Sequence, residues 1–192
     1  MTLPHWEYFL SIEADLERCS RFVEFSPNNY KTYSIEFARI IMAAASEFDT
    51  VAKLLCSCID PSQTPSSINF YHPIIISKYP LFVEFEILMS RYKLTFIPWN
   101  NWEVGSSPNW WSKGYNKIKH ERDQYFHEAN LENAILATCG LLAGILYYYD
   151  SKFGGIMPMI DLFQSPKLLM PQHYSPDGYD PGGIFWDYNL LK

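Results

Sequence analysis

The sequence predicts a mainly α-helical protein: a bundle of four to five helices, with a small β-hairpin or irregular insertion at about residues 71–109 and an irregular C-terminal arm. Several long segments carry apolar residues at helical spacing, with capping residues before them and breakers after them. The 192 residues are 48% hydrophobic and 19% charged, a composition that supports one substantial core.

Two helices are predicted in the first third of the chain. Apolar residues recur close to helical spacing over residues 3–25, and Pro4 suits the first turn of a helix. The second helix runs from residue 32 or 34 to residue 59, because Ser34 can cap it and Pro61 ends it.

The middle of the chain is predicted to contain strands. Residues 60–70 have the composition of a loop, and the residues after them lose the helical period. Apolar and charged residues alternate over 83–87 and polar and apolar residues over 93–96, which predicts a hairpin turning near residues 90–92. A helix over residues 80–92 is the alternative.

Two further helices are predicted beyond a Trp- and Pro-rich turn region. The third runs from residue 110 or 111 to about 127, and the fourth from 129 or 130 to about 149, as an antiparallel pair. Gly140 and Gly144 lie four residues apart and permit another helix to approach the fourth helix closely. The apolar stretch 134–149 is shorter than the roughly 20 residues that cross a bilayer, so a buried helix is expected.

The domain organisation follows from these elements. Residues 1–150, including the insertion at 60–109, are expected to form one helical domain, and residues 151–192 an arm packed on that domain or on a second subunit. Prolines and glycines predict that the arm has no long regular element. Its apolar anchors are Leu162–Phe163, Leu168–Leu169–Met170 and Ile184–Phe185–Trp186.

Charge and targeting signals restrict the class of function. A net charge of −6 argues against a protein that coats DNA or RNA, although it leaves room for a small basic site. The N-terminus has no signal-peptide pattern, so a soluble, cytoplasmic protein with reduced cysteines and no membrane partner is expected.

The predicted third helix concentrates the polar chemistry of the chain. A helical wheel places Arg122 on a largely aromatic side, with Trp111, Tyr115, Ile118, Tyr125, Phe126 and Ala129. The opposite side carries Lys113, Asn116, His120 and His127. A cation, an amide and two imidazoles form a candidate phosphate site with acid/base groups, and a merely solvated polar face is the alternative.

Arg122 needs a partner if it lies among aromatic residues. Glu36 and Glu47 of the second helix are candidates for an ion pair that clamps the two helices together. An anionic ligand is the alternative partner. The histidines are scattered and lack the spacing of known metal sites, so no metal and no cofactor is expected.

The segment Arg122-Asp-Gln-Tyr-Phe-His127 resembles the signature of the HEPN superfamily, which is an Arg, four to six intervening residues that often begin with a polar one, and then a His. The resemblance implies a helical domain over residues 1–150 whose Arg and His meet across a homodimer and cleave RNA without a metal. In that case Arg122 holds the phosphate and His127 is the acid/base.

A wider pattern is similar to a group of bacterial proteins over roughly residues 20–150. It comprises Trp-Trp-x-x-x-Tyr-Asn-x-x-Lys-His-x-Arg, then Ala-Asn-Leu-x-Asn-Ala, and Ser-Glu-Phe-Asp-x-x-x-Lys in the second helix. In that pattern the run Lys119-His120-x-Arg122 is as prominent as His127, so either histidine is a candidate.

The sequence therefore predicts a HEPN-like RNA-binding protein or metal-independent endoribonuclease, a homodimer in a defence or toxin–antitoxin setting. The candidate catalytic residues are Arg122, His127, His120 and Asn116. The alternative is a noncatalytic helical interaction module, whose Trp, Tyr and Pro residues in 96–111 and 150–192 bind a protein partner.

Overall fold

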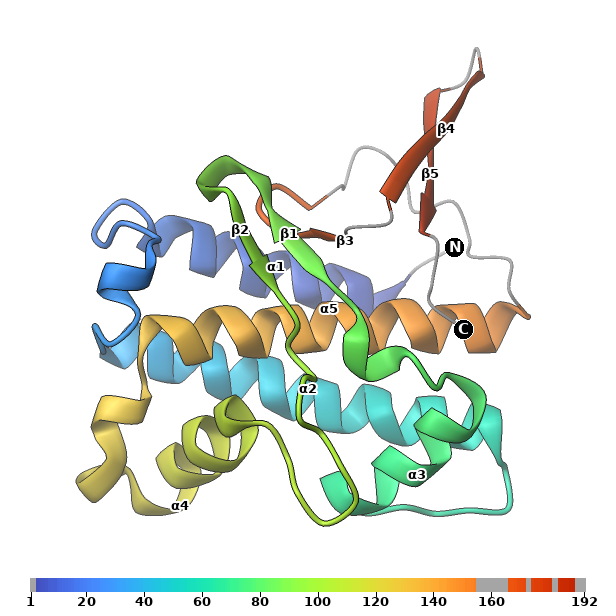
Figure 1. Cartoon of the computed structure of the whole chain (residues 1–192), viewed down its shortest axis with the longest axis horizontal. Coiled ribbons are helices and arrows are strands. Elements are labelled where there is room, and N and C mark those ends of the chain that lie inside the picture. The colour runs from blue at the N-terminus through green and yellow to red at the C-terminus, as the bar shows by residue number, and fades with distance from the viewer. Residues whose placement is uncertain (1–2, 155–165, 172–173, 181–182, 189–192) are drawn as a thin grey trace.

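The computed structural model describes residues 3–154, 166–171, 174–180 and 183–188 (Figure 1). Within these residues the fold is mainly α-helical, as the sequence predicts, and small β-elements accompany the helices. The α-helices are α1 (Pro4–Cys19), α2 (Ile35–Ile59), α3 (Ile68–Lys78), α4 (Asn116–Tyr125) and α5 (Leu131–Phe153). The strands are β1 (Ile87–Met89), β2 (Leu94–Phe96), β3 (Met170–Pro171), β4 (Tyr174–Asp180) and β5 (Gly183–Tyr188).

The two longest helices, α2 and α5, run side by side in the same direction (Figure 1). Their N-termini are joined by a short antiparallel backbone contact. The amide of Ser34 donates to the carbonyl of Ala129 at 3.1 Å, and the amide of Leu131 donates to the carbonyl of Thr32 at 2.9 Å. This contact fixes the relative register of the two helices from their first turns.

Side-chain caps begin both of these helices. The Ser34 hydroxyl accepts a hydrogen bond from the amide of Phe37 at 3.1 Å, which confirms the predicted cap of α2. The Asn130 side chain accepts one from the amide of Asn133 at 3.0 Å at the start of α5. Each cap satisfies a backbone donor that the helix itself leaves unpaired.

Glycines in α5 make room for aromatic rings. A Cβ on Gly144 would lie 2.8 Å from the ring of Phe48 on α2, and a Cβ on Gly140 would lie 2.7 Å from the ring of Trp110. The carbonyl of Gly140 also accepts a hydrogen bond from the indole of Trp99 at 3.2 Å. The predicted close approach at Gly140 and Gly144 is therefore confirmed.

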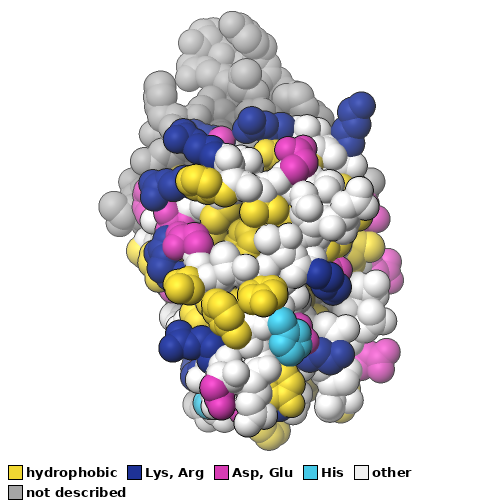
Figure 2. All heavy atoms as spheres, turned by 90° about the vertical axis from the view of Figure 1, so that its left-hand side faces the viewer, with side chains coloured by type: hydrophobic (Ala, Val, Ile, Leu, Met, Phe, Trp, Pro, Cys, Tyr) yellow, Lys and Arg dark blue, Asp and Glu magenta, His cyan; other side chains and the backbone are white. Residues whose placement is uncertain are grey.

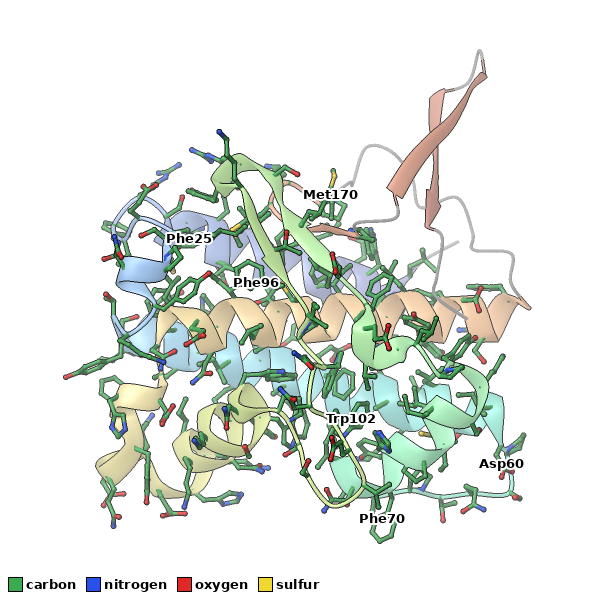
Figure 3. The ribbon with its side chains drawn as sticks, viewed as in Figure 1. Phe25, Asp60, Phe70, Phe96, Trp102 and Met170 are labelled. Atoms are coloured by element: carbon green, nitrogen blue, oxygen red, sulfur yellow. The ribbon has the colours of Figure 1, made fainter. Side chains whose placement is uncertain are left out.

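The tryptophans of the turn region fill the core. Trp99, Trp102, Trp110 and Trp111 are all buried, and Trp99 lies 4.2 Å from the ring of Phe48. Figure 3 shows Trp102 inside the molecule, between the loop that carries it and α3. The predicted interaction surface over residues 96–111 is therefore wrong for these aromatic side chains, because the core encloses them.

The predicted hairpin is present, but its first strand lies at Ile87–Met89 and not over residues 83–87. Strands β1 and β2 pair antiparallel, with Ile87 opposite Phe96, and a single 3₁₀ turn over Ser90–Tyr92 joins them. Only a short 3₁₀ turn forms at Phe82–Glu84, so the alternative helix over residues 80–92 is wrong. The hairpin crosses α5 on the side away from α2 (Figure 1).

Helix α3 was not expected. It occupies Ile68–Lys78, where the sequence indicates a loop followed by strands, and it contains Pro73. Tyr71 and Ile75 are fully buried, whereas Phe70 is 61% exposed and points away from the bundle (Figure 3). Burial of one face thus forms a helix despite an internal proline, which removes one helical hydrogen bond.

The C-terminal arm begins on the body of the same chain. Strand β3 pairs antiparallel with β1 and completes a sheet of order β2-β1-β3; its Met170 lies beside the hairpin (Figure 3). Strands β4 and β5, of seven and six residues, form a separate two-stranded ribbon, so the arm is more regular than predicted although its elements are short. The anchor Leu162–Phe163 lies outside the described residues.

A buried carboxylate holds this arm in place. Glu13 of α1, 3% exposed, accepts hydrogen bonds from the amides of Lys167, Leu168 and Leu169 at 2.8–2.9 Å. Burial raises the pKa of Glu13, and the backbone amides act against that rise. The side chains of Leu168 and Leu169 are buried beside it, so these two predicted anchors are confirmed.

Helix α5 is long and apolar enough to cross a membrane by length and composition alone, but 89% of its most apolar window is buried inside this protein. Its surroundings are the other helices and the aromatic core. Burial accounts for its apolar character.

We expect Gly140→Ala to destabilise the protein by about 1–3 kcal/mol, because the new methyl overlaps the Trp110 ring. Helix propensity alone predicts the opposite, a gain of about 1 kcal/mol. Urea denaturation measures the difference, with Ser46→Ala on exposed α2 surface as a control expected within about 0.5 kcal/mol of wild type. A stabilised Gly140→Ala protein would contradict the packing described here.

We expect Glu13→Ala to accelerate hydrogen exchange at the amides of Lys167, Leu168 and Leu169, which lose their acceptor. The stability loss should be about 1–3 kcal/mol, the cost of leaving buried groups unpaired. Exchange measured by NMR or mass spectrometry reports both effects. Glu17→Gln, on the same helix but half-buried, should leave those amides protected.

Candidate functional site

The predicted third helix is broken into three pieces of different geometry. A π-helix spans Trp110–Tyr115, α4 follows over Asn116–Tyr125, and a 3₁₀ turn spans Phe126–Glu128. Within α4, Glu121 has non-helical angles, φ −138° and ψ 36°. The prediction of one regular helix over residues 110–127 is therefore wrong.

These breaks change which side chains lie together. A regular α-helix turns by about 100° per residue, whereas a π-helix turns less, and a kink resets the direction of everything after it. His120 and Arg122 flank the kink at Glu121, and both line one groove. The wheel placed them on opposite sides, so that division is wrong.

The groove lies between the first half of α2 and α4 and has a volume of about 1130 Å³. Its floor is apolar, and Ile35 is 78% exposed at its edge. The lining residues are Ile35, Ala38, Arg39, Met42, Ile118, Lys119, His120, Arg122, Asp123 and Phe126.

The α4 wall of the groove carries its available positive charge. Arg122 is exposed and forms no hydrogen bond or ion pair with the residues that the structure describes. Lys119 lies over the Tyr115 ring, 5.2 Å from its centroid, and donates a hydrogen bond to the Tyr115 hydroxyl at 3.3 Å. Asp123 is the acidic residue of the lining, so an anion entering the groove meets a net positive α4 wall.

The other two candidate site residues are not part of the groove lining. His127 is exposed in the 3₁₀ turn after α4, with its Nε2 3.7 Å from Oε1 of Glu128. Asn116 is half-buried at the start of α4. The structure thus brings Arg122 and His120 together and leaves His127 and Asn116 outside this groove.

The turn that carries His127 is nevertheless firmly held. The Asn130 side-chain amide donates to the carbonyl of His127 at 3.2 Å, and the Asn133 side-chain amide donates to the carbonyl of Glu128 at 2.9 Å. Both asparagines are buried. The two asparagines at the start of α5 therefore attach this turn to the helix, which accounts for the spacing Asn-x-x-Asn in the sequence.

The predicted clamp between Arg122 and α2 is absent from the described residues. Glu36 instead pairs with Arg39, which lowers the pKa of Glu36 through their hydrogen bonds. Glu47 pairs with His5 of α1, with 2.5 Å between Oε1 and Nδ1. Partners closer in the fold satisfy both carboxylates, and Arg122 faces the groove.

Three of the groove residues were not singled out from the sequence. Ile35, Arg39 and Met42 are spaced by four and three residues, so they share one stripe of α2. The available signal was the helical spacing that places Ile35 and Met42 on the same stripe of α2 as Arg39. Its interpretation depended on knowing that α4 lies opposite.

No group of three or more His, Cys, Asp or Glu side chains that could hold a metal ion occurs in the described part of the chain. The exposed hydrophobic side chains of Figure 2 lie among Lys and Arg side chains, with a histidine beside them, on the end of the molecule where α2 and α5 begin.

Comparisons of the chain with protein-family models, curated proteins and solved structures found no match.

We expect Arg122→Met to change the free energy of unfolding by less than about 0.5 kcal/mol, because the guanidinium is exposed and unpaired among the described residues. Glu47→Ala, which removes the partner of His5 between α1 and α2, should cost about 1 kcal/mol or more. Urea denaturation of both variants compares them. A large loss in Arg122→Met would reveal a structural partner for this arginine.

Proposed function

We propose that the groove between α2 and α4 binds RNA and that the protein is a HEPN-like, metal-independent endoribonuclease in a defence or toxin–antitoxin system. The observation that carries this proposal is the convergence of Arg122, Lys119 and His120 on an apolar groove. Neither Arg122 nor Lys119 forms an ion pair with another described residue.

The apolar floor suits the bases of an unpaired strand. Phe126 and Met42 lie in the lining, and Ile35 offers further exposed apolar surface. Bases that are not paired can stack on such a floor while the backbone follows the cations. A duplex hides its bases, so single-stranded RNA is the form that uses both parts of the groove.

The chemistry assigns one role to each polar group. The planar guanidinium of Arg122 donates hydrogen bonds to the phosphate oxygens and stabilises the charge that develops there. His120 takes the proton of the ribose 2′-hydroxyl, whose oxygen attacks the adjacent phosphorus. The bond from phosphorus to the 5′-oxygen breaks, that oxygen gains a proton, and a 2′,3′-cyclic phosphate remains.

A second copy of the chain would supply the second proton-transfer group. His127 lies outside the groove of its own chain, on a turn held by Asn130. In a homodimer, His127 of one copy can face Arg122 of the other and protonate the leaving 5′-oxygen. Ile35, 78% exposed at the edge of the groove, offers apolar surface for that contact.

The wider sequence pattern contains both structural residues and residues of the proposed site. Trp110 and Trp111 belong to the aromatic core, Tyr115 packs against Trp111, and Asn130 caps α5. Packing or capping thus accounts for these positions. It gives His120 and Arg122 no comparable role, so a ligand is the natural explanation of their placement.

A noncatalytic interaction module is the second candidate. The specific observation in its favour is the exposure of Phe22 at 82% and of Ile35 at 78%, which offer apolar surface to a partner near the start of α2. This module would use the end of the molecule shown in Figure 2 and need no acid/base group. The two functions differ in their dependence on His120.

We expect the purified protein to cleave single-stranded RNA in the presence of EDTA, and Arg122→Ala and His120→Ala to lower the rate by about a hundredfold or more. Arg91→Ala, an exposed arginine away from the groove, is the matched control and should keep full activity. Gel analysis of a labelled RNA measures the rates.

Mixing two inactive variants tests the dimer. If sites are shared, Arg122→Ala and His127→Ala proteins should each be inactive alone and regain part of the activity after co-refolding. RNA binding without cleavage in the wild type would contradict the endoribonuclease and leave only the RNA-binding part of the proposal. Absence of both binding and cleavage would refute the proposed function.

A further inference from the structure

Asn133, in the first turn of α5, contacts both ends of the segment that carries the cations of the groove. Its side-chain amide donates to the carbonyl of Glu128 at 2.9 Å and to Oε2 of the same residue at 3.2 Å. A Cβ on Gly114 would lie 3.2 Å from Cγ of Asn133, so the backbone of Gly114 packs directly against this side chain. Residues 114 and 128 therefore meet at one buried asparagine.

This double contact, the Asn133 link, is incompatible with a straight helix. A regular α-helix rises 1.5 Å per residue, so over residues 114–128 its ends would lie about 21 Å apart. The chain instead leaves helical geometry at Glu121, with φ −138° and ψ 36°, and again at Tyr125, with φ −114° and ψ 25°. These two breaks let the segment fold back to the start of α5 (Figure 1).

The reversal decides where two residues of the candidate site lie. Side chains two positions apart on a regular α-helix point in directions about 160° apart. His120 and Arg122 stand on either side of the break at Glu121, and both line the groove. Their shared wall therefore depends on the reversal of the segment.

The middle of the segment is held less firmly than its ends. Beyond the buried Ile118, residues 119–124 are largely exposed. The ion pair between Glu121 and Lys117 stays inside the segment and lies on the surface, where such pairs contribute little to stability. The position of the middle is consequently set from its ends, where the Asn133 link acts.

We propose that Asn133 is a positioning residue for the candidate site: its contacts with both ends of residues 114–128 impose the reversal that brings His120 and Arg122 to one wall of the groove. This role rests on the proposed ribonuclease function. Asn133 is not part of the groove lining, so it acts through the segment that it holds. Misplacement of a reacting group by about 1 Å can lower a rate by about a hundredfold.

Asn133→Ala removes the donor that binds Glu128. Hydrogen exchange measured by mass spectrometry on the full chain should rise by about tenfold or more over residues 116–128, because the loss of a buried hydrogen bond loosens the segment. The kcat for cleavage of a single-stranded RNA in EDTA should fall by about tenfold. The Kd for the RNA should change by less than about threefold, because the cations and the apolar floor remain.

Thr138→Val is the matched control. Thr138 is also buried on α5, and its hydroxyl donates to the carbonyl of Ala134 at 2.9 Å within the same helix. The substitution removes one buried hydrogen bond that does not involve residues 114–128. Exchange over residues 116–128 and kcat should therefore equal those of the wild type.

Two further changes test the link without removing the side chain of Asn133. Gly114→Ala places a methyl group against Asn133 from the other end of the segment, and it should raise the exchange and lower kcat as Asn133→Ala does. Asn133→Asp puts a second carboxylate beside Glu128. Adding Glu128→Gln restores a donor and an acceptor with their roles exchanged, so this double variant should regain part of the protection and of kcat.

The outcomes separate the link from the proposed function. Unchanged exchange over residues 116–128 in both Asn133→Ala and Gly114→Ala, or an equal rise in Thr138→Val, would overturn the Asn133 link. Raised exchange with an unchanged kcat would overturn its positioning role. Absence of cleavage by the wild type, with exchange still raised in Asn133→Ala, would instead refute the proposed function and leave the link intact.

Discussion

The parallel contact between α2 and α5 is the constraint on which the rest of the structure depends. The two helices start from one backbone contact at Ser34 and Ala129, and Gly144 lets the ring of Phe48 pack against the α5 backbone further along. The side of α2 that faces α5 is consequently apolar and buried. The opposite stripe, with Ile35 and Arg39, is left for the groove, so the position of the candidate site is set by the core.

Signals in the local sequence were sufficient to predict the elements that are stabilised mainly by neighbouring residues. Ser34 and the apolar period predict α2, and alternation around residues 90–92 predicts the hairpin. Long-range contacts decide the elements that were missed. Helix α3 exists because Tyr71 and Ile75 are buried by other parts of the fold. Strand β3 pairs with β1, and the segment just before it is held by Glu13, far away in the sequence, which accepts the amides of Lys167, Leu168 and Leu169.

The candidate site was predicted in part. Its residue types and approximate location, Arg122 and His120 on the helix after the tryptophans, are present in one groove. A regular helical wheel could not give their arrangement, because the π-helix and the kink at Glu121 alter the rotation between residues. The predicted ion pair between Arg122 and Glu36 does not form, for a different reason. Arg39, only three residues from Glu36, reaches it at a smaller cost in side-chain entropy.

The shared direction of α2 and α5 also shapes the electric field of the molecule. Parallel helices place both positive ends of their peptide dipoles together, and each end acts as about half a positive charge. Helix α1 runs the opposite way and offsets part of this field (Figure 1). A chain with a net charge of −6 can thus present a locally positive potential at one end, where Ile35 marks the mouth of the groove. Backbone orientation thus contributes to the field at this end of the molecule, together with the charged side chains there, which include Glu36 and Glu132 in the first turns of α2 and α5.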